Sequence, residues 1–295
     1  MLNKLVLGTA NFGLDYGIAN RSRLSREEIH NILEYARSHG VWGIDTAKAY
    51  GDAENIMGEY FTQYGKTFGV ITKLPQKEYE TTREIEDDIF ESLKNMNIEH
   101  IDFVLLHSYE TYKLYGKKII PVLQSFSRDK VIGCYGVSVY HPEEAEEISG
   151  DIKDNLAIEF PLNLFDRRFL NNGLIQRLKS RGDFLFARSV FLQGLFFLDE
   201  EKLTGSLARV KDKIKKIRTI SEEYNIKPEN IALLFVIGKS WLDGVIVGVD
   251  SCDHLMSNIR ICSNENLDTY KLIEPLIKDL AVYDEEVILP YRWET

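Results

Sequence analysis

The sequence predicts a (β/α)8 barrel that spans residues 1–295 as a single domain, with an added helix or two near the C-terminus. Short apolar runs alternate with longer segments of helical periodicity from one end of the chain to the other. The apolar runs are continuous rather than alternating, which is typical of parallel strands covered by helices. Eight such units in 295 residues fit a closed barrel better than an open sheet.

The eight predicted strands leave room for a helix between each pair. The first four are KLVLGTA, VWGIDTA, GVITK and IDFVLLH, and the last four are IGCYGVSV, NLAIEFPL, FLFARS and GVIVG. No Pro-, Gly- or Ser-rich linker divides them, which favours one domain. No GxGxxG motif follows the first strand, and this disfavours a doubly wound dinucleotide fold.

Helices are predicted in the gaps between these strands. The first runs from Ser25 to His39, because Ser25 is a good N-cap, Glu28 completes a capping box and Gly40 supplies a stop. TTREIEDDIFESLKNMNI has its apolar residues on one helical stripe. The other predicted helices are 53–62, 119–128, 142–148, 166–181 and PENIALLFVIGKSW, with an insertion over 200–225 and an added helix over 264–282.

Composition excludes several classes of function. The formal net charge of −10 argues against nucleic acid or an anionic membrane as the main partner. The three cysteines form no CxxC pair, and no stretch approaches the ~18 apolar residues of a membrane span. The N-terminus shows no signal-peptide pattern. We therefore expect a cytoplasmic protein that acts on a small molecule, without a predicted metal site.

Four polar side chains are expected at one mouth of the barrel. Asp45 ends the second predicted strand, Tyr50 lies in the loop after it, and Lys73 and His107 end the third and fourth strands. Barrel enzymes build their sites at these strand ends. A phenol titrates near pH ~10, but a lysine beside it, held by a carboxylate, makes it a useful general acid. With a histidine to orient a bound carbonyl, the set implies carbonyl reduction.

Each of these residues also has a structural interpretation. Asp45 could cap the following helix, and Tyr50 could be an aromatic at the rim. Lys73 could be a solvated charge, and His107 a satisfied core histidine. A lysine at a strand end beside a tyrosine also suits Schiff-base aldolase chemistry on Lys73. The convergence of four groups from three neighbouring strands favours the catalytic interpretation.

Segments along nearly the whole chain resemble the aldo-keto reductase superfamily, especially its bacterial, sugar-processing branch. In order they are LGTANFG, GIDTAKAYGDAENIMGE, ITK, VLLH, GVSV, IEFPLNLFDRR, ARSVFLQGLF and IVGVDSCDHLMSNI. The resemblance implies that Tyr50 is the general acid, that Asp45 and Lys73 lower its pKa, and that His107 bonds the substrate oxygen. It also implies a nicotinamide cofactor as hydride donor, with NADP(H) favoured and NAD(H) left open.

The positions that would hold the nicotinamide depart from the pattern of this resemblance. Ser138 is followed by Val139 where asparagine is usual, Glu159 replaces a glutamine, and Arg188 replaces a stacking aromatic. A carboxylate can accept from the carboxamide NH2 but cannot donate to its oxygen. Arg188 could stack on the ring or pair with Glu159 on the adjacent strand. These departures leave open a cofactor-binding regulatory or accessory subunit with little turnover.

The loop after the seventh strand is expected to surround the pyrophosphate of the cofactor. Ser189, Gln193 and Gly194 match that loop in the resemblance. Backbone N–H groups and small residues let phosphates approach closely there.

The segment IVGVDSCDHLMSN is expected to contact the adenosine. Gly248 and His254 stand where a lysine and an arginine often hold the 2′-phosphate, and Asn258 keeps the adenine contact. Asp250 and Ser251 lie in the same turn. A carboxylate near the ribose favours free hydroxyls and therefore NAD(H), whereas the structural alternative is a solvated turn whose aspartate caps the last helix.

The substrate is expected to be a carbonyl compound, preferably a sugar or nucleotide-linked sugar. Aromatic and hydroxyl surfaces suit stacking on a sugar ring while bonding its hydroxyl groups. The predicted walls are Phe12, Tyr16, Tyr109, Tyr112, Phe191 and residues 196–198.

Overall fold

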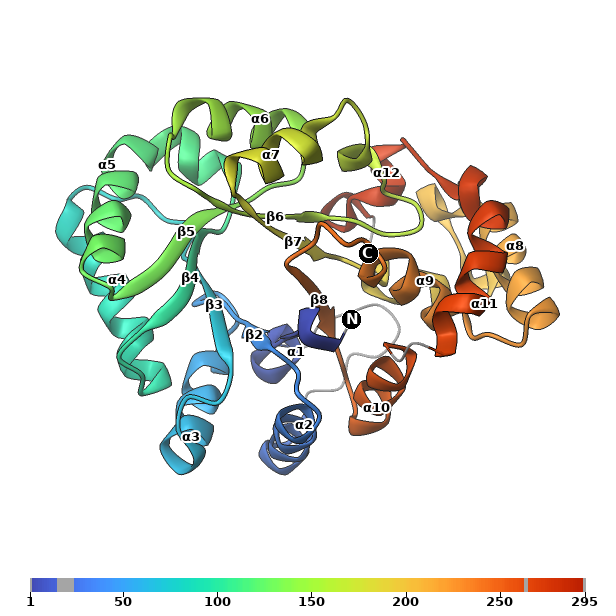
Figure 1. Ribbon diagram of the computed structural model, residues 1–295, viewed down its shortest axis with the longest axis horizontal. Helices are drawn as coiled ribbons and strands as arrows, with labels where there is room; N and C mark the ends of the chain where they lie inside the picture. Colours follow the sequence, from blue (N-terminus) through green and yellow to red (C-terminus); the bar gives the residue numbers. More distant parts are fainter. Residues whose placement is uncertain (1, 15–23, 263–264, 294–295) are drawn as a thin grey trace.

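A computed structural model describes residues 2–14, 24–262 and 265–293, and it shows the predicted barrel (Figure 1). The eight strands are parallel and pair in sequential order, and β1 pairs with β8 to close the sheet. The strands are β1 (Leu5–Gly8), β2 (Gly43–Asp45), β3 (Gly69–Leu74), β4 (Ile101–Leu106), β5 (Ile132–Ser138), β6 (Ala157–Pro161), β7 (Phe184–Arg188) and β8 (Gly244–Gly248). The predicted fold class is confirmed.

Helices surround the sheet, and further helices follow β8. They are α1 (Ala10–Gly13), α2 (Arg26–Ser38), α3 (Ala53–Tyr64), α4 (Thr82–Met96), α5 (Tyr109–Arg128), α6 (Pro142–Asp151), α7 (Leu174–Arg181), α8 (Lys211–Glu223), α9 (Pro228–Ile237), α10 (Cys252–Ile261), α11 (Glu265–Ile273) and α12 (Glu285–Ile288). Short 3-10 helices connect several of them: Leu2–Lys4, Arg168–Leu170, Leu192–Phe197, Glu200–Lys202, Gly205–Val210, Glu274–Leu280 and Pro290–Arg292. Among the described residues, no helix is both long and apolar enough to cross a membrane.

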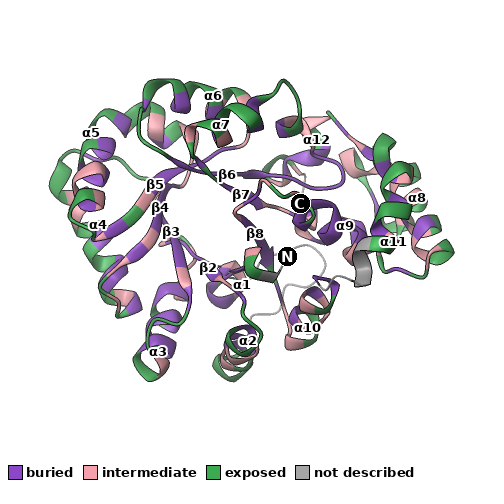
Figure 2. Ribbon diagram, in the orientation of Figure 1, coloured by how far each residue is buried: buried purple, intermediate pink, exposed green. Residues whose placement is uncertain are grey.

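The outer helices bury one stripe against the sheet and expose the other, as Figure 2 shows. In α2 the buried residues are those that the periodicity selects: Ile29, Ile32, Leu33 and Ala36. Its N-terminus has the predicted capping box, in which the Ser25 hydroxyl accepts from the Glu28 backbone N–H. Local sequence signals and burial therefore agree in this helix.

Apolar side chains fill the inside of the barrel towards its amino end. The buried members of this cluster come from six strands: Val6, Ile71, Phe103, Leu105, Ala157, Phe186 and Ile246. Because successive strand residues face opposite sides of the sheet, Leu5 and Leu7 instead join the larger core between sheet and helices. The interior is thus packed, and polar groups are left to the carboxyl mouth.

Two glycines bring the loop after β2 against α1. A Cβ on Gly13 would lie 1.8 Å from the backbone oxygen of Tyr50, and one on Gly51 would lie 2.7 Å from the Gly13 oxygen. Gly51 also has φ of +58°, a conformation that L side chains rarely adopt. A larger residue at either position would push away the loop that carries Tyr50.

Several predicted boundaries were wrong. Helix α5 begins at Tyr109 rather than at residue 119, because the Ser108 hydroxyl caps it by accepting from the Thr111 backbone N–H. The segment 166–181 is helical only as a 3-10 turn and α7, and the predicted insertion contains α8. The predicted added helix over 264–282 divides into α11 and the 3-10 helix Glu274–Leu280.

Candidate active site

A cavity of about 980 Å³ opens at the carboxyl ends of the strands. Strand-end residues Gly8, Asp45, Ser138, Arg188 and Gly248 all line it. Twelve of the fourteen site residues predicted from the sequence are in its lining: Asp45, Tyr50, His107, Ser138, Glu159, Arg188, Ser189, Gln193, Gly194, Gly248, Asp250 and Asn258. Residues that are far apart in the chain are therefore gathered around one space.

The two exceptions are Lys73 and Ser251. Lys73 lies beneath the cavity surface, with 1% of its side chain exposed. Ser251 caps α10, because its hydroxyl accepts from the His254 backbone N–H. Ser251 lies outside the cavity lining and its hydroxyl accepts from the helix terminus, so a cofactor contact at Ser251 stays a prediction.

Four charged side chains of alternating sign form a chain across the barrel mouth, and three of them are buried. Lys73 Nζ donates to Asp45 Oδ1 and lies 3.2 Å from Glu159 Oε2. The other oxygen, Glu159 Oε1, lies 3.3 Å from Arg188 Nε. We refer to Asp45, Lys73, Glu159 and Arg188 as the charge chain. Of the two alternatives left open for Arg188, the pairing with Glu159 is present in the structure.

The structural interpretations of Asp45 and Lys73 are wrong. Asp45 does not cap α3, since Asp52 is at that N-cap and Asp45 bonds Lys73 instead. Lys73 is not a solvated charge, because it is almost fully buried between two carboxylates. A buried cation requires such partners, because burial without them costs several kcal/mol.

Burial and pairing set the pKa values in the charge chain. Burial raises the pKa of the Asp45 carboxyl, and the Lys73 ammonium opposes this effect. Burial alone would lower the pKa of Lys73, but Asp45 and Glu159 outweigh it and raise that pKa. Burial alone would raise the pKa of Glu159, but Lys73 and Arg188 together lower it. Lys73 is therefore firmly cationic and Glu159 firmly anionic.

Tyr50 and His107 lie next to this chain. Their ring centroids are 5.8 Å apart with the planes nearly perpendicular, and Lys73 Nζ is 5.7 Å from the Tyr50 ring centroid. His107 lines the cavity, and its buried Nδ1 has no hydrogen-bond partner within the described parts of the chain. This does not fit a histidine satisfied in the core. The ring borders the cavity, so a bound molecule could reach its exposed edge.

His107 is expected to stay neutral at physiological pH. Burial and the neighbouring Lys73 lower its pKa to about 4. An NMR titration of the histidine rings, with His107 assigned through His107→Gln, should show the neutral ring down to about pH 5. Because the unfolded chain protonates first on acidification, His107 should also reduce fold stability as pH falls from about 6.5 towards 4. A His107 midpoint above pH 6 would contradict this burial argument.

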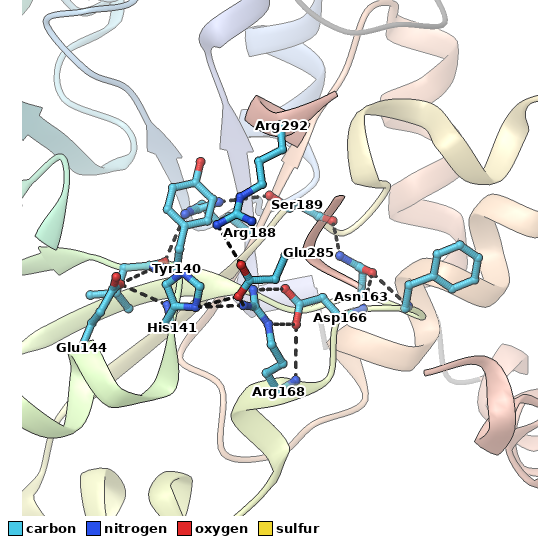
Figure 3. A network of polar contacts seen from close by, with 12 residues as sticks. Tyr140, His141, Glu144, Asn163, Asp166, Arg168, Arg188, Ser189, Glu285 and Arg292 are labelled. Atoms are coloured by element: carbon cyan, nitrogen blue, oxygen red, sulfur yellow. Dashed lines mark hydrogen bonds and ion pairs between the residues drawn. The ribbon is translucent and has the colours of Figure 1, made fainter. Parts of the chain in front are cut away.

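Arg188 is held from several sides at the cavity wall. Its guanidinium donates to the Ser138 hydroxyl at 3.3 Å, to the Ser189 hydroxyl at 3.2 Å and to the Val139 carbonyl at 3.1 Å. Its carbon centre lies 4.1 Å from the Tyr140 ring centroid (Figure 3). The backbone N–H groups at Tyr140 and His141 both donate to Glu144 Oε2, which fixes this strand end.

The segment after α12 supplies another wall of the cavity. Tyr291 packs edge-on against Tyr140 at 4.9 Å between centroids, and Pro290 and Tyr291 line the cavity. Glu285 anchors this segment, because Arg168 and Arg292 each contact one of its carboxylate oxygens (Figure 3). Sequence reasoning missed these residues, because no local pattern links Tyr291 to Tyr140, which follows β5.

The loop after β7 departs from ordinary backbone conformations. Ser189, Leu192 and Gln193 have φ of 59°, 46° and 53°, and Gly194 has φ of 92°. Asn163 Nδ2 donates to the Ser189 carbonyl at 3.1 Å and ties the loop to the end of β6. Left-handed φ at three non-glycine residues is uncommon, and such strain concentrates at binding sites.

The end of the cavity near α10 carries charges of both signs. Its lining includes Lys227, Glu229, Asp250, Asp253 and His254. Asp250 and His254 form an ion pair one helical turn apart, and this pairing raises the pKa of His254. Sequence reasoning missed Lys227 and Glu229, which precede and begin α9, because no motif marks them as cavity residues. It also missed Gln76, which follows β3 and lines the cavity.

The predicted aromatic walls are only partly correct. Phe191 and Phe197 line the cavity, whereas Phe12 is fully buried in the core. Tyr109 and Tyr112 belong to α5 and donate to carboxylates on α6, Glu147 and Asp151, outside the cavity lining. Tyr16, the sixth predicted wall, falls outside the described residues. Across residues 2–14, 24–262 and 265–293, no cluster of three or more His, Cys, Asp or Glu side chains could hold a metal ion.

The fold and the cavity together define a barrel whose polar and charged groups gather at the carboxyl ends of its strands, the arrangement of barrel enzymes. A model of the Aldo/keto reductase family matches residues 4–274, and the chain belongs to that family. Membership makes it an oxidoreductase that acts on carbonyl or alcohol groups.

Individual relatives are distant in sequence. D-arabinose 1-dehydrogenase of Saccharomyces cerevisiae (strain ATCC 204508 / S288c) is 20% identical over 282 residues, covering 88% of this chain and 82% of the yeast protein. The holo structure of aldo-keto reductase AKR11C1 from Bacillus halodurans has a TM-score of 0.76 and 19% identity, covering 96% of this chain and 94% of that one. A structure from Pseudomonas aeruginosa has a TM-score of 0.66 and 21% identity over 88% of both chains.

Proposed function

We propose that the protein interconverts an aldehyde or ketone and its alcohol with NAD(P)H, and that Tyr50 is the general acid and base. One observation carries the proposal: Tyr50 and His107 share a wall of the 980 Å³ cavity beside the buried Lys73. A buried cation beside a phenol favours the phenolate, which makes the phenol a better proton donor near neutral pH.

Each residue of the proposed site has a separate role. The neutral His107 ring donates a hydrogen bond to the carbonyl oxygen and orients it. The Tyr50 hydroxyl gives its proton to that oxygen, and in the reverse direction the phenolate accepts the alcohol proton. Lys73, held by Asp45, stabilises the phenolate. The bound nicotinamide would supply or accept the hydride.

A dinucleotide fits the cavity better at its phosphate and adenine parts than at the nicotinamide. The left-handed loop at Ser189 and Gln193, and the buried Asn258, border the cavity. At the nicotinamide part, the Ser138 hydroxyl already donates to Glu159 Oε1 at 2.9 Å, and Arg188 donates to Ser138. Ser138 can still accept a hydrogen bond and Glu159 can still accept from an amide NH2. The NH2 of the carboxamide would thus find acceptors, but its oxygen would lack the amide donor that an asparagine or glutamine offers.

The direct test is binding of NADPH and NADH, followed by protein fluorescence quenching and by nicotinamide emission. Saturable binding of at least one of them is expected. Absence of binding to both would overturn the proposal. Turnover on a panel of aldoses and simple aldehydes then tests the reaction itself.

The choice between the two cofactors has support on each side. The resemblance favours NADP(H), and we propose it as the first candidate. The carboxylates of Glu229, Asp250 and Asp253 at the α10 end favour NAD(H), because they would repel a 2′-phosphate and accept from ribose hydroxyls. The ratio of the two dissociation constants at fixed ionic strength decides between them.

A sugar is the proposed substrate class, supported by the yeast relative's name and by aromatic walls at Phe191, Phe197, Tyr140 and Tyr291. Tyr291→Ala removes one stacking surface, so KM for an aldose should rise about fivefold. The Kd of the dinucleotide should stay the same. Tyr283→Ala, which alters an exposed tyrosine outside the lining, is the control. Equal effects of both variants would remove Tyr291 from the substrate wall.

An accessory subunit that binds a dinucleotide with little turnover is the second candidate. The mutual bonding of Ser138, Glu159 and Arg188 favours it, because these groups are already engaged. Tight dinucleotide binding without turnover on any carbonyl would support it. Schiff-base chemistry at Lys73 is disfavoured, since a buried ammonium between two carboxylates is a poor nucleophile. Borohydride trapping with substrate should leave Lys73 unlabelled.

A further inference from the structure

The charge chain holds one carboxylate more than Lys73 alone can neutralise. Lys73 contacts both Asp45 and Glu159, so each carboxylate takes part of its positive field. Glu159 is 1% exposed and cannot be screened by water. Without a further cation, the two carboxylates and the single ammonium would leave an excess negative charge beside Tyr50. A negative charge there opposes formation of the phenolate.

Arg188 supplies that further cation. Its Nε lies 3.3 Å from Glu159 Oε1, on the side of the carboxylate opposite the oxygen that faces Lys73. Tyr140 stacks on the guanidinium, which lies beside Ser189 (Figure 3). The Ser138 and Ser189 hydroxyls and the Val139 carbonyl accept its hydrogen bonds, so its position is fixed. The guanidinium cannot lose its proton in a protein.

We propose that Arg188 is a positioning residue for the acid–base step, which acts through Glu159 so that Lys73 remains able to stabilise the Tyr50 phenolate. The proposal rests on the role given to Tyr50 in the proposed function. It adds that Glu159 and Arg188 act as a matched pair of opposite charges that must be present or absent together.

The groups expected to set the proton affinity of Tyr50 come from four strands and from the residue that follows β4. Among the described residues, the charged or titratable side chains that contact Tyr50 or join it through Lys73 include Asp45 on β2, Lys73 on β3, His107 after β4, Glu159 on β6 and Arg188 on β7. Helix α1, which packs against the Tyr50 loop, brings none. Lys48, on the same loop, is engaged by Asp88 and Glu91 on α4. In the alkaline range where a phenol titrates, His107 is neutral and both carboxyls are ionised.

The pairing predicts opposite effects of two single substitutions on the ligand-free protein. Arg188→Gln removes a positive charge and should raise the Tyr50 titration midpoint by roughly half to one and a half pH units. Glu159→Gln removes a negative charge and should lower that midpoint. The double variant Glu159→Gln/Arg188→Gln keeps the net charge and should return close to the parent midpoint.

The experiment is an NMR titration of tyrosine labelled with ¹³C at the ring carbon that bears the hydroxyl, with Tyr50 assigned through Tyr50→Phe. Circular dichroism at each pH checks that the fold persists. Arg188→Lys keeps the charge and should leave the midpoint nearly unchanged. If Arg188→Gln does not fold, the comparison of Glu159→Gln with the double variant tests the charge of Arg188 instead. Lys227→Gln, which removes an exposed cavity cation paired only loosely with Glu229, is the matched charge control and should not shift Tyr50.

The outcomes separate this inference from the proposed function. Opposite shifts with recovery in the double variant support the pairing, even if no dinucleotide binds. Midpoints that are unchanged in both single variants, or that move in the same direction, overturn it even if dinucleotide binding and turnover are found. A purely structural role of Arg188 would leave the Tyr50 midpoint of a folded Arg188→Gln variant unchanged.

Discussion

Replacing Tyr50 by phenylalanine is expected to lower kcat roughly 10²–10⁴-fold, because it removes the proposed proton donor while keeping the ring. The perpendicular contact with His107 survives the change, since it depends on the ring rather than on the hydroxyl. The Kd of the dinucleotide should therefore stay within about twofold of the parent value. Steady-state kinetics with an aldose, together with a fluorescence titration of the cofactor, measure both quantities.

Tyr109→Phe is the control for this prediction. Tyr109 also donates a hydrogen bond to a carboxylate, that of Glu147, but it lies outside the cavity lining. Removing the Tyr109 hydroxyl should leave kcat unchanged. If Tyr50→Phe retained kcat near the parent value, the proton would have to come from another group, and Tyr50 would be removed from the mechanism.

Replacing Lys73 by methionine is expected to destabilise the fold by about 3–5 kcal/mol at neutral pH, as well as to abolish turnover. The change leaves Asp45 and Glu159 buried without the cation between them. Arg188 still contacts Glu159, so Asp45 carries most of the cost. Urea unfolding followed by circular dichroism measures the loss.

The pH dependence of that loss follows from the direction of the Asp45 shift. Burial raises the pKa of Asp45, and removing Lys73 takes away the effect that opposes the rise. A folded state that binds protons more tightly than the unfolded chain loses stability as pH rises. The Lys73→Met variant should therefore be closer to the parent at pH 5 than at pH 8. The double variant Lys73→Met/Asp45→Asn, which keeps the pair of Glu159 and Arg188, should recover most of the stability without activity. Equal destabilisation at both pH values would contradict the argument.

The barrel and most of its site could be predicted because their signals are local in sequence. Strand ends such as Asp45 and Lys73 follow short apolar runs, and parallel pairing carries them to one mouth. The capping box at Ser25 is likewise contained within four residues. The pairing of Arg188 with Glu159 could be predicted because adjacent strands place them at similar height.

What could not be predicted depends on contacts between distant segments or on competing local uses of a side chain. Tyr291 meets Tyr140 only because Glu285 anchors the intervening segment to Arg168. Ser251 was predicted to contact a cofactor, but its hydroxyl accepts a hydrogen bond from the N-terminus of α10. Tyr109 was predicted at the cavity rim because it is an aromatic residue that follows a strand end. It instead begins α5, because Ser108 caps that helix.

The backbone conformation of the loop after β7 lowers the stability of the fold at the cavity. Ser189, Leu192 and Gln193 each hold a left-handed conformation that costs a non-glycine residue about 1 kcal/mol. A library selected only for heat resistance should therefore enrich glycine at these positions. Such variants would gain stability while losing the Ser189 and Gln193 side chains that face the cavity. At this loop, selection for thermal stability favours glycine, whereas selection for activity favours the side chains that line the cavity.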